Sequence, residues 1–165
     1  MRRLRWRDAT ATRLFLPSVV AALVPLVVAT VRALDRGWLP VGDNAYFAIR
    51  AADVFSDDPP LLGTWTSNSL ASGIDANNPG PLYFDALAIP ARLLPGGPGL
   101  AIGVAVLNGL AVVAIAVMAR RRAGPLVGML ATAVTAALCW AMGSELLFDP
   151  WQPHAMLLPS SPSWC

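Results

Sequence analysis

The sequence predicts an all-α, polytopic membrane protein with three transmembrane helices and two extracytoplasmic juxtamembrane helices. Two observations predict this class. The 165 residues are 56% hydrophobic, and they contain three apolar runs of about 17 to 21 residues, close to what a helix needs to cross a hydrocarbon core of roughly 30 Å. Arginines cluster at the ends of these runs, and such clusters mark the cytoplasmic side of a membrane.

Charge and hydropathy divide the chain into an Arg-rich N-terminus, a span, a long loop, a second span, a short loop, a third span and a tail. Their ranges are residues 1–13, 14–34, 35–98, 99–119, 120–125, 126–142 and 143–165. The positive-inside rule places both the N-terminal arginines and the triplet Arg120-Arg121-Arg122 in the cytoplasm. Three spans satisfy both placements. They leave the long loop and the tail together on the outer face of the cell (inner/plasma) membrane.

The first span has an alternative interpretation as a cleaved signal peptide. Its apolar run is long for a signal peptide, however, and no convincing cleavage site precedes Asp35. We therefore expect a retained signal anchor, kinked at Pro17 and Pro25, because membrane helices tolerate proline better than soluble helices do. Nucleic-acid binding is not expected, since the arginine clusters abut apolar spans instead of forming a separate basic face. The two cysteines, Cys139 and Cys165, cannot form a disulfide framework or a metal cluster.

Two short helices are predicted in the long loop. The first covers residues 44–55, with Asp43 as a natural N-cap. The second covers residues 81–94 and begins with Pro81 after the turn Asn77-Asn78-Pro79-Gly80. It is strongly apolar but too short to span, so we expect it to lie in the membrane interface. Between the helices the chain has no clear periodicity, and Trp65 is the expected interfacial anchor.

Three stretches on the predicted outer face resemble the N-terminal part of the GT-C membrane glycosyltransferases, such as protein mannosyltransferases and aminoarabinose transferases. Gly42-Asp43-Asn44-Ala45-Tyr46-Phe47-Ala48-Ile49-Arg50 resembles the acidic motif of the first outer loop. Asn78-Pro79-Gly80-Pro81-Leu82-Tyr83-Phe84 resembles the start of the second juxtamembrane helix, and Asp149-Pro150-Trp151-Gln152-Pro153-His154 resembles the second outer loop. The family more often has His at position 78 and Asn at position 152. It also continues through further spans, so we expect this chain to be a fragment that is inactive alone.

The resemblance implies a polyprenyl-phosphate-linked sugar as donor, and no cofactor is expected. No metal site is assigned, because Asp57 and Asp58 lack further ligands at a suitable spacing. It implies two catalytic carboxylates and four substrate-binding residues, which are Asp43 and Asp149, and Tyr46, Arg50, Asn78 and His154. A carboxylate is suited to accept a proton from, or to orient, an acceptor hydroxyl or amine. An arginine suits the donor phosphate.

Each of these residues also has a structural interpretation. Asp43 can simply cap its helix, and Arg50 can pair with Asp53 one turn later. Asn78 can be a turn former, and His154 can lie in the membrane interface without contacting substrate. Two other classes of function remain open. One is a small non-enzymatic membrane protein whose outer loop is a docking surface, and the other is a transporter fragment, which would be expected to have more ionisable residues inside its spans.

Overall fold

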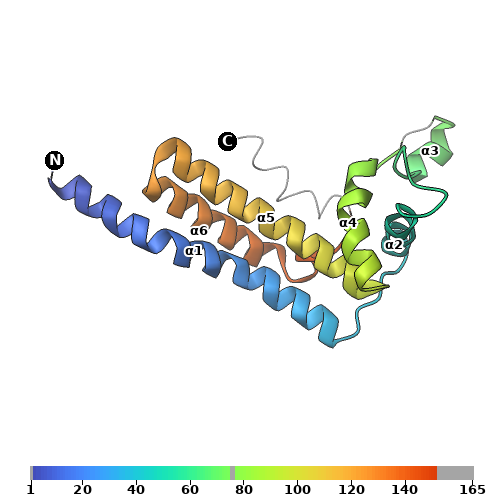
Figure 1. Cartoon of the computed structure of the whole chain (residues 1–165), viewed down its shortest axis with the longest axis horizontal. Coiled ribbons are helices and arrows are strands. Elements are labelled where there is room, and N and C mark those ends of the chain that lie inside the picture. Colours follow the sequence, from blue (N-terminus) through green and yellow to red (C-terminus); the bar gives the residue numbers. More distant parts are fainter. Residues whose placement is uncertain (1, 75–76, 152–165) are drawn as a thin grey trace.

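The structure, a computed structural model, describes residues 2–74 and 77–151, and all regular secondary structure within them is helical. The predicted all-α class is confirmed. The elements are α1 (Arg2–Asp35), α2 (Asp43–Asp53), α3 (Ser67–Ser72), α4 (Pro81–Leu93), α5 (Gly97–Ala123), α6 (Pro125–Met142) and the 3-10 turn η1 (Glu145–Leu147). Figure 1 shows α1, α5 and α6 side by side as one bundle, with α2, α3 and α4 gathered at the end far from the N-terminus.

Three helices are long and apolar enough to cross a membrane, namely Thr10–Asp35 within α1, α5 and α6. Each of these helices packs against the other two. Small side chains such as Ala22 and Ala29 are buried between the helices, whereas large ones such as Leu16 and Leu130 are exposed. Small residues at helix contacts and large apolar residues outside are the arrangement that lipid favours. The predicted class of three-span membrane protein is therefore confirmed.

Polar side chains inside the bundle satisfy most of their hydrogen bonds locally. The Thr132 hydroxyl donates to the carbonyl oxygen of Gly128 at 2.7 Å, and Thr30 donates to Leu26 at 2.8 Å. Asn108 is fully buried and donates from Nδ2 to the carbonyl oxygen of Leu147 at 3.0 Å. This bond fixes η1 against α5, so the residue joins a span to the segment that follows α6.

The turn between α5 and α6 is tighter than the loop of residues 120–125 predicted from the sequence. The arginine triplet lies in the last helical turn of α5, where positive charge interacts favourably with the helix dipole. Gly124 then ends α5 with φ of 88°, and Pro125 begins α6. The guanidinium carbon of Arg120 lies 4.5 Å from the centre of the Phe15 ring on α1. The triplet and the N-terminal half of α1 thus lie at the same end of the bundle.

At the opposite end, α4 packs between α2 and α5. Its most buried side chains, Phe84 and Leu87, belong to a core that also holds Phe47 of α2 and Leu100 of α5. α4 was predicted to lie in the membrane interface, and the structure shows that one of its faces is covered by protein. Its other face exposes large apolar side chains to the surroundings, namely Leu82, Ile89 and Leu93.

The segment between α2 and α4 contains an element that the sequence did not predict. α3 is a single short helix with a capping box, in which Thr66 accepts a hydrogen bond from the backbone N–H of Ser69. Backbone hydrogen bonds join Thr64 to Asn78 and Pro79, with N–O distances of 2.8 and 3.2 Å. These bonds bring the two ends of the segment together beside the start of α4.

Candidate functional site

Asp43 lies at the exposed start of α2. It was predicted as the N-cap, but the structure places Gly42 there, with φ of 58°, and Asp43 is the first helical residue. The difference has a simple physical basis: glycine adopts this positive φ without strain, so the helix can begin one residue earlier. The Asp43 carboxylate makes no hydrogen bond or ion pair with any residue that the structure describes. Its side chain is therefore exposed and unpaired within the described residues.

Tyr46 lies three residues after Asp43, and Arg50 lies four residues after Tyr46, so the three residues share one face of α2. Tyr46 is 43% exposed. Arg50 is not comparably free. Its Nη1 lies 3.0 Å from a carboxylate oxygen of Asp53 and 3.8 Å from one of Asp58. The pairing with Asp53 is the structural interpretation made from the sequence, and it is confirmed. A guanidinium already shared by two carboxylates is a weaker candidate for a donor phosphate.

Asn78 contributes its backbone to the link with Thr64, and its side chain is exposed. Within the described residues, no hydrogen bond or ion pair joins the side chains of Asp43, Tyr46, Arg50 and Asn78 to one another. Only Asp43 and Tyr46 combine exposure with a place at the start of a surface helix. His154 lies outside the residues that the structure describes.

Asp149 is positioned by α4 through a residue that the sequence did not single out. The hydroxyl of Tyr83 donates a hydrogen bond to the carbonyl oxygen of Pro150, next to Asp149. Tyr83 is buried, and its ring packs edge-to-face on Phe47 and Phe84. Burial raises the pKa of Tyr83, and the negative charge of Asp149 raises it further. Asp149 itself accepts a hydrogen bond from the backbone N–H of Trp151 at 2.9 Å.

The α2–α4 core thus connects both predicted catalytic carboxylates to one rigid scaffold. Asp43 begins the helix that carries Phe47, and Asp149 follows η1 beside Tyr83. Tyr83 lies in the quoted motif of residues 78–84 and in the predicted apolar helix, but neither pattern assigns it a role. Within the described parts of the chain, no group of three or more His, Cys, Asp or Glu side chains is arranged to hold a metal ion.

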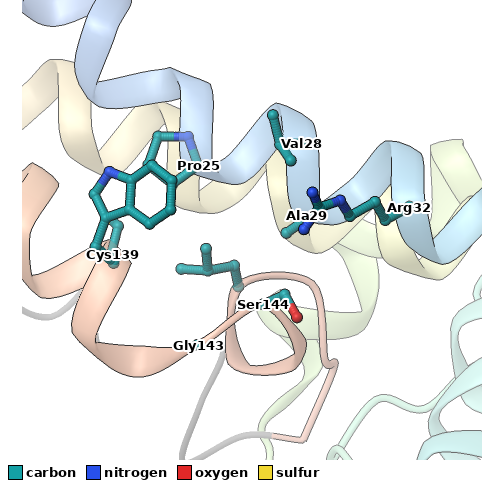
Figure 2. A pocket seen from close by; sticks show the side chains of 9 residues that line it. Pro25, Val28, Ala29, Arg32, Cys139, Gly143 and Ser144 are labelled. Carbon is teal, nitrogen blue, oxygen red and sulfur yellow. The ribbon is translucent and has the colours of Figure 1, made fainter.

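Two hollows lie away from these residues. Two hollows of about 310 Å³ each flank the junction of α1, α6 and η1, and both are lined by Arg32 of α1. Figure 2 shows one of them, with Pro25, Val28, Ala29 and Arg32 on α1 and with Cys139, Gly143 and Ser144 on the segment opposite. Arg32 lies within the predicted first span of residues 14–34, to which the sequence assigned no other role. Its proximity to Ser144 depends on how α1 and α6 pack, which the sequence pattern does not specify.

Comparison with known proteins identified no related protein. No protein-family model, curated protein or solved structure matches the chain. The chain is a helical membrane protein with three spans and a surface domain of short helices at one end of the bundle. Its function is therefore argued from the geometry of its own residues.

Proposed function

We propose that this chain is the N-terminal portion of an integral membrane glycosyltransferase that moves a sugar from a polyprenyl-phosphate donor to an extracytoplasmic acceptor. The observation that carries the proposal is the unpaired, exposed carboxylate of Asp43 at the start of α2. The helix bearing it is fixed to the bundle by Phe47, which packs against Tyr83 and Phe84 of α4. A free carboxylate on a fixed helix at the end of a membrane bundle suits an acceptor that arrives from solution.

The distribution of arginines between the two ends of the bundle supports one orientation of the chain in the membrane. The arginine triplet ends α5 beside Phe15 of α1, and the surface helices lie at the opposite end. Arginines near span ends favour the cytoplasmic side. We place the N-terminus and the triplet in the cytoplasm and Asp43 on the outer face of the cell membrane. A lipid-linked sugar would then meet Asp43 at the outer interface.

The proposed reaction assigns the role of general base to Asp43. The bond between the sugar and the donor phosphate breaks, and its electron pair leaves with the polyprenyl phosphate. A bond from the acceptor oxygen to the sugar forms, and the acceptor proton passes to Asp43, which acts as general base. Asp149 is the second acidic residue near the donor or acceptor. Tyr83 is a positioning residue, because it holds the Pro150 carbonyl and thereby the adjoining carboxylate.

A second function is favoured by a different observation. Large apolar side chains are exposed around the surface helices, with Val41, Leu61 and Leu62 each about three-quarters exposed. Exposed apolar residues of this kind are typical of surfaces that contact another protein or the membrane. In this alternative the chain is a small non-enzymatic membrane protein, and the outer loop is a docking surface with no catalytic carboxylate.

Sugar transfer by the full-length protein, reconstituted in vesicles with a radiolabelled polyprenyl-phosphate sugar, separates the two functions. Asp43→Asn should lower the transfer rate by about a hundredfold or more, because a general base typically contributes 10² to 10⁴. Asp85→Asn is the matched control, since Asp85 is an exposed carboxylate on α4 within the same loop. Transfer that survives Asp43→Asn would remove Asp43 from the reaction. An absence of transfer in the unmodified protein would leave the docking function.

A further inference from the structure

The two hollows beside η1 form an amphiphilic surface at the end of α1. One hollow is lined mainly by apolar side chains, including Pro25, Val28, Trp140 and Leu147. The neighbouring hollow adds Arg36 and Glu145, and the two share Ala29, Arg32 and Ser144. A mainly apolar hollow thus adjoins a charged one, which we call the rim.

The rim lies at the depth where lipid phosphates are found. Arg13 and Arg32 bracket the uncharged part of α1, which extends about 28 Å at 1.5 Å per residue, close to a hydrocarbon core of roughly 30 Å. Trp140 near the end of α6 is strongly exposed. Tryptophan at such a position is typical of the belt between hydrocarbon and headgroups. A bilayer of this thickness around α1 would place Arg32 at one headgroup layer and Arg13 at the other.

The charge of the rim is unbalanced. Arg32 lies in the last turn of α1, Arg36 follows the end of the helix, and both line this hollow. Neither guanidinium comes within 4.0 Å of a carboxylate in the described part of the chain. Glu145 is the acidic residue that lines the same hollow. Two arginines and one glutamate leave a net charge of about +1, which a single phosphodiester would neutralise.

We propose that the hollows at α1, α6 and η1 bind one anionic glycerophospholipid, with its phosphodiester between Arg32 and Arg36. One acyl chain lies against Pro25, Val28 and Trp140. The Glu145 carboxylate and the Ser144 hydroxyl are placed to accept hydrogen bonds from a headgroup hydroxyl, so phosphatidylglycerol fits the charge and the polar groups together. The bound lipid bridges α1 and η1 and stabilises the segment that leads to Asp149. Lipid binding at this site does not require the proposed sugar transfer.

Native mass spectrometry of the full chain in detergent, titrated with defined lipids, tests the site. We expect one phosphatidylglycerol molecule to be retained at lower concentration than phosphatidylcholine or phosphatidylethanolamine. Arg32→Gln and Arg36→Gln should each weaken retention about fivefold, as expected for one cationic side chain at a membrane surface. Arg32→Lys should keep most of the affinity. Arg92→Gln is the matched control, because Arg92 is exposed near the same end of the bundle but lines neither hollow.

Several results would overturn the proposal. Equal retention of phosphatidylglycerol and phosphatidylcholine would show that the arginines do not recognise the charge. A preference for phosphatidylethanolamine would indicate that Glu145 dominates the rim. Inorganic phosphate that competes with the lipid at equal concentration would leave the apolar hollow without a role. An effect of Arg92→Gln as large as that of Arg32→Gln would indicate nonspecific attraction, provided that circular dichroism shows the same helix content in both variants.

Discussion

The hydroxyl of Tyr83 donates a hydrogen bond to the carbonyl oxygen of Pro150, a residue 67 positions further along the chain. The two residues are separated in sequence by α5 and α6, yet both are buried at the same end of the bundle. Through its ring, Tyr83 also contacts Phe47 of α2. One side chain therefore connects the two loops that carry the candidate carboxylates. The geometry of the candidate site depends on it.

Replacing Tyr83 by Phe removes this bond while keeping the ring contacts. The buried Pro150 carbonyl then loses its partner, which typically costs about 1–3 kcal/mol. We expect the free energy of unfolding in mild detergent to fall by that amount, measured by denaturant titration. Tyr46→Phe is the control, because Tyr46 is exposed and should change stability by less than about 0.5 kcal/mol. Similar losses in both variants would show that the Tyr83 bond contributes no stability of its own.

The same bond predicts a specific dependence on alkaline pH. Burial and the charge of Asp149 raise the pKa of Tyr83, whereas an unfolded chain has a tyrosine pKa of about 10. A group whose pKa is raised on folding contributes stability that is complete below the unfolded value and is lost as pH rises toward the folded value. We therefore expect the stability difference between the unmodified protein and Tyr83→Phe to be constant up to about pH 9. Above about pH 10 it should shrink.

Unfolding free energies of both proteins at several pH values from about 8 to 11 measure this difference. Lysine titration does not interfere, since the sequence contains no lysine. A difference that stays constant across the whole range would mean that Tyr83 titrates alike in the folded and unfolded states. Its burial would then have no electrostatic consequence.

How far the sequence predicted this structure can be seen at particular residues. The third span was expected over residues 126–142 and is observed over Pro125–Met142, and α4 begins at Pro81 as expected. Both follow from local signals, namely an uninterrupted apolar run and proline at the first helical position. Asp43 was predicted as the N-cap of α2 but is its first helical residue. Local propensity does not decide whether aspartate or the preceding glycine occupies the cap.

The candidate site was less predictable than the spans. The bond from Tyr83 to Pro150 and the approach of Arg32 to Ser144 both join residues that are distant in sequence. Such contacts depend on how helices pack, and hydrophobic periodicity gives only the buried face of each helix. α3 was missed for a related reason. Its six residues are too few to show a period, and its capping box stabilises it locally.

The backbone geometry at Gly63 leads to a further prediction. Its φ is 85°, and a Cβ atom placed there would lie 2.2 Å from the carbonyl oxygen of Pro79. That oxygen accepts the N–H of Thr64, so Gly63→Ala should break the link between the two ends of the loop. We expect a loss of about 1–3 kcal/mol from the positive φ and the clash together, with faster proteolysis of the loop.

Gly80→Ala provides the matched control in the same turn. Gly80 has a φ of −74°, and a Cβ atom at this position would meet nothing within 4 Å. The alanine variant should therefore retain its resistance to proteolysis. Equal protease sensitivity in the two variants would show that the close approach of Gly63 to Pro79 does not hold the loop together.

The orientation of the bundle can be tested by cysteine labelling in intact cells. In a background lacking Cys139 and Cys165, Leu61→Cys places a thiol on the surface loop, and Ala123→Cys places one after the arginine triplet. Both positions are exposed, so a thiol at either should react whenever the reagent reaches its side of the membrane. A membrane-impermeant maleimide should label Leu61→Cys at once, and Ala123→Cys only after the membrane is permeabilised.

This result follows because arginines near span ends are retained in the cytoplasm, and the structure places the triplet and the surface helices at opposite ends of the bundle. The proposed transfer requires Asp43 to meet a sugar presented at the outer interface. Labelling of Ala123→Cys in intact cells, together with protection of Leu61→Cys, would place Asp43 in the cytoplasm. The proposal of extracytoplasmic glycosyl transfer would then be wrong, although the fold and the lipid site at Arg32 would be unaffected.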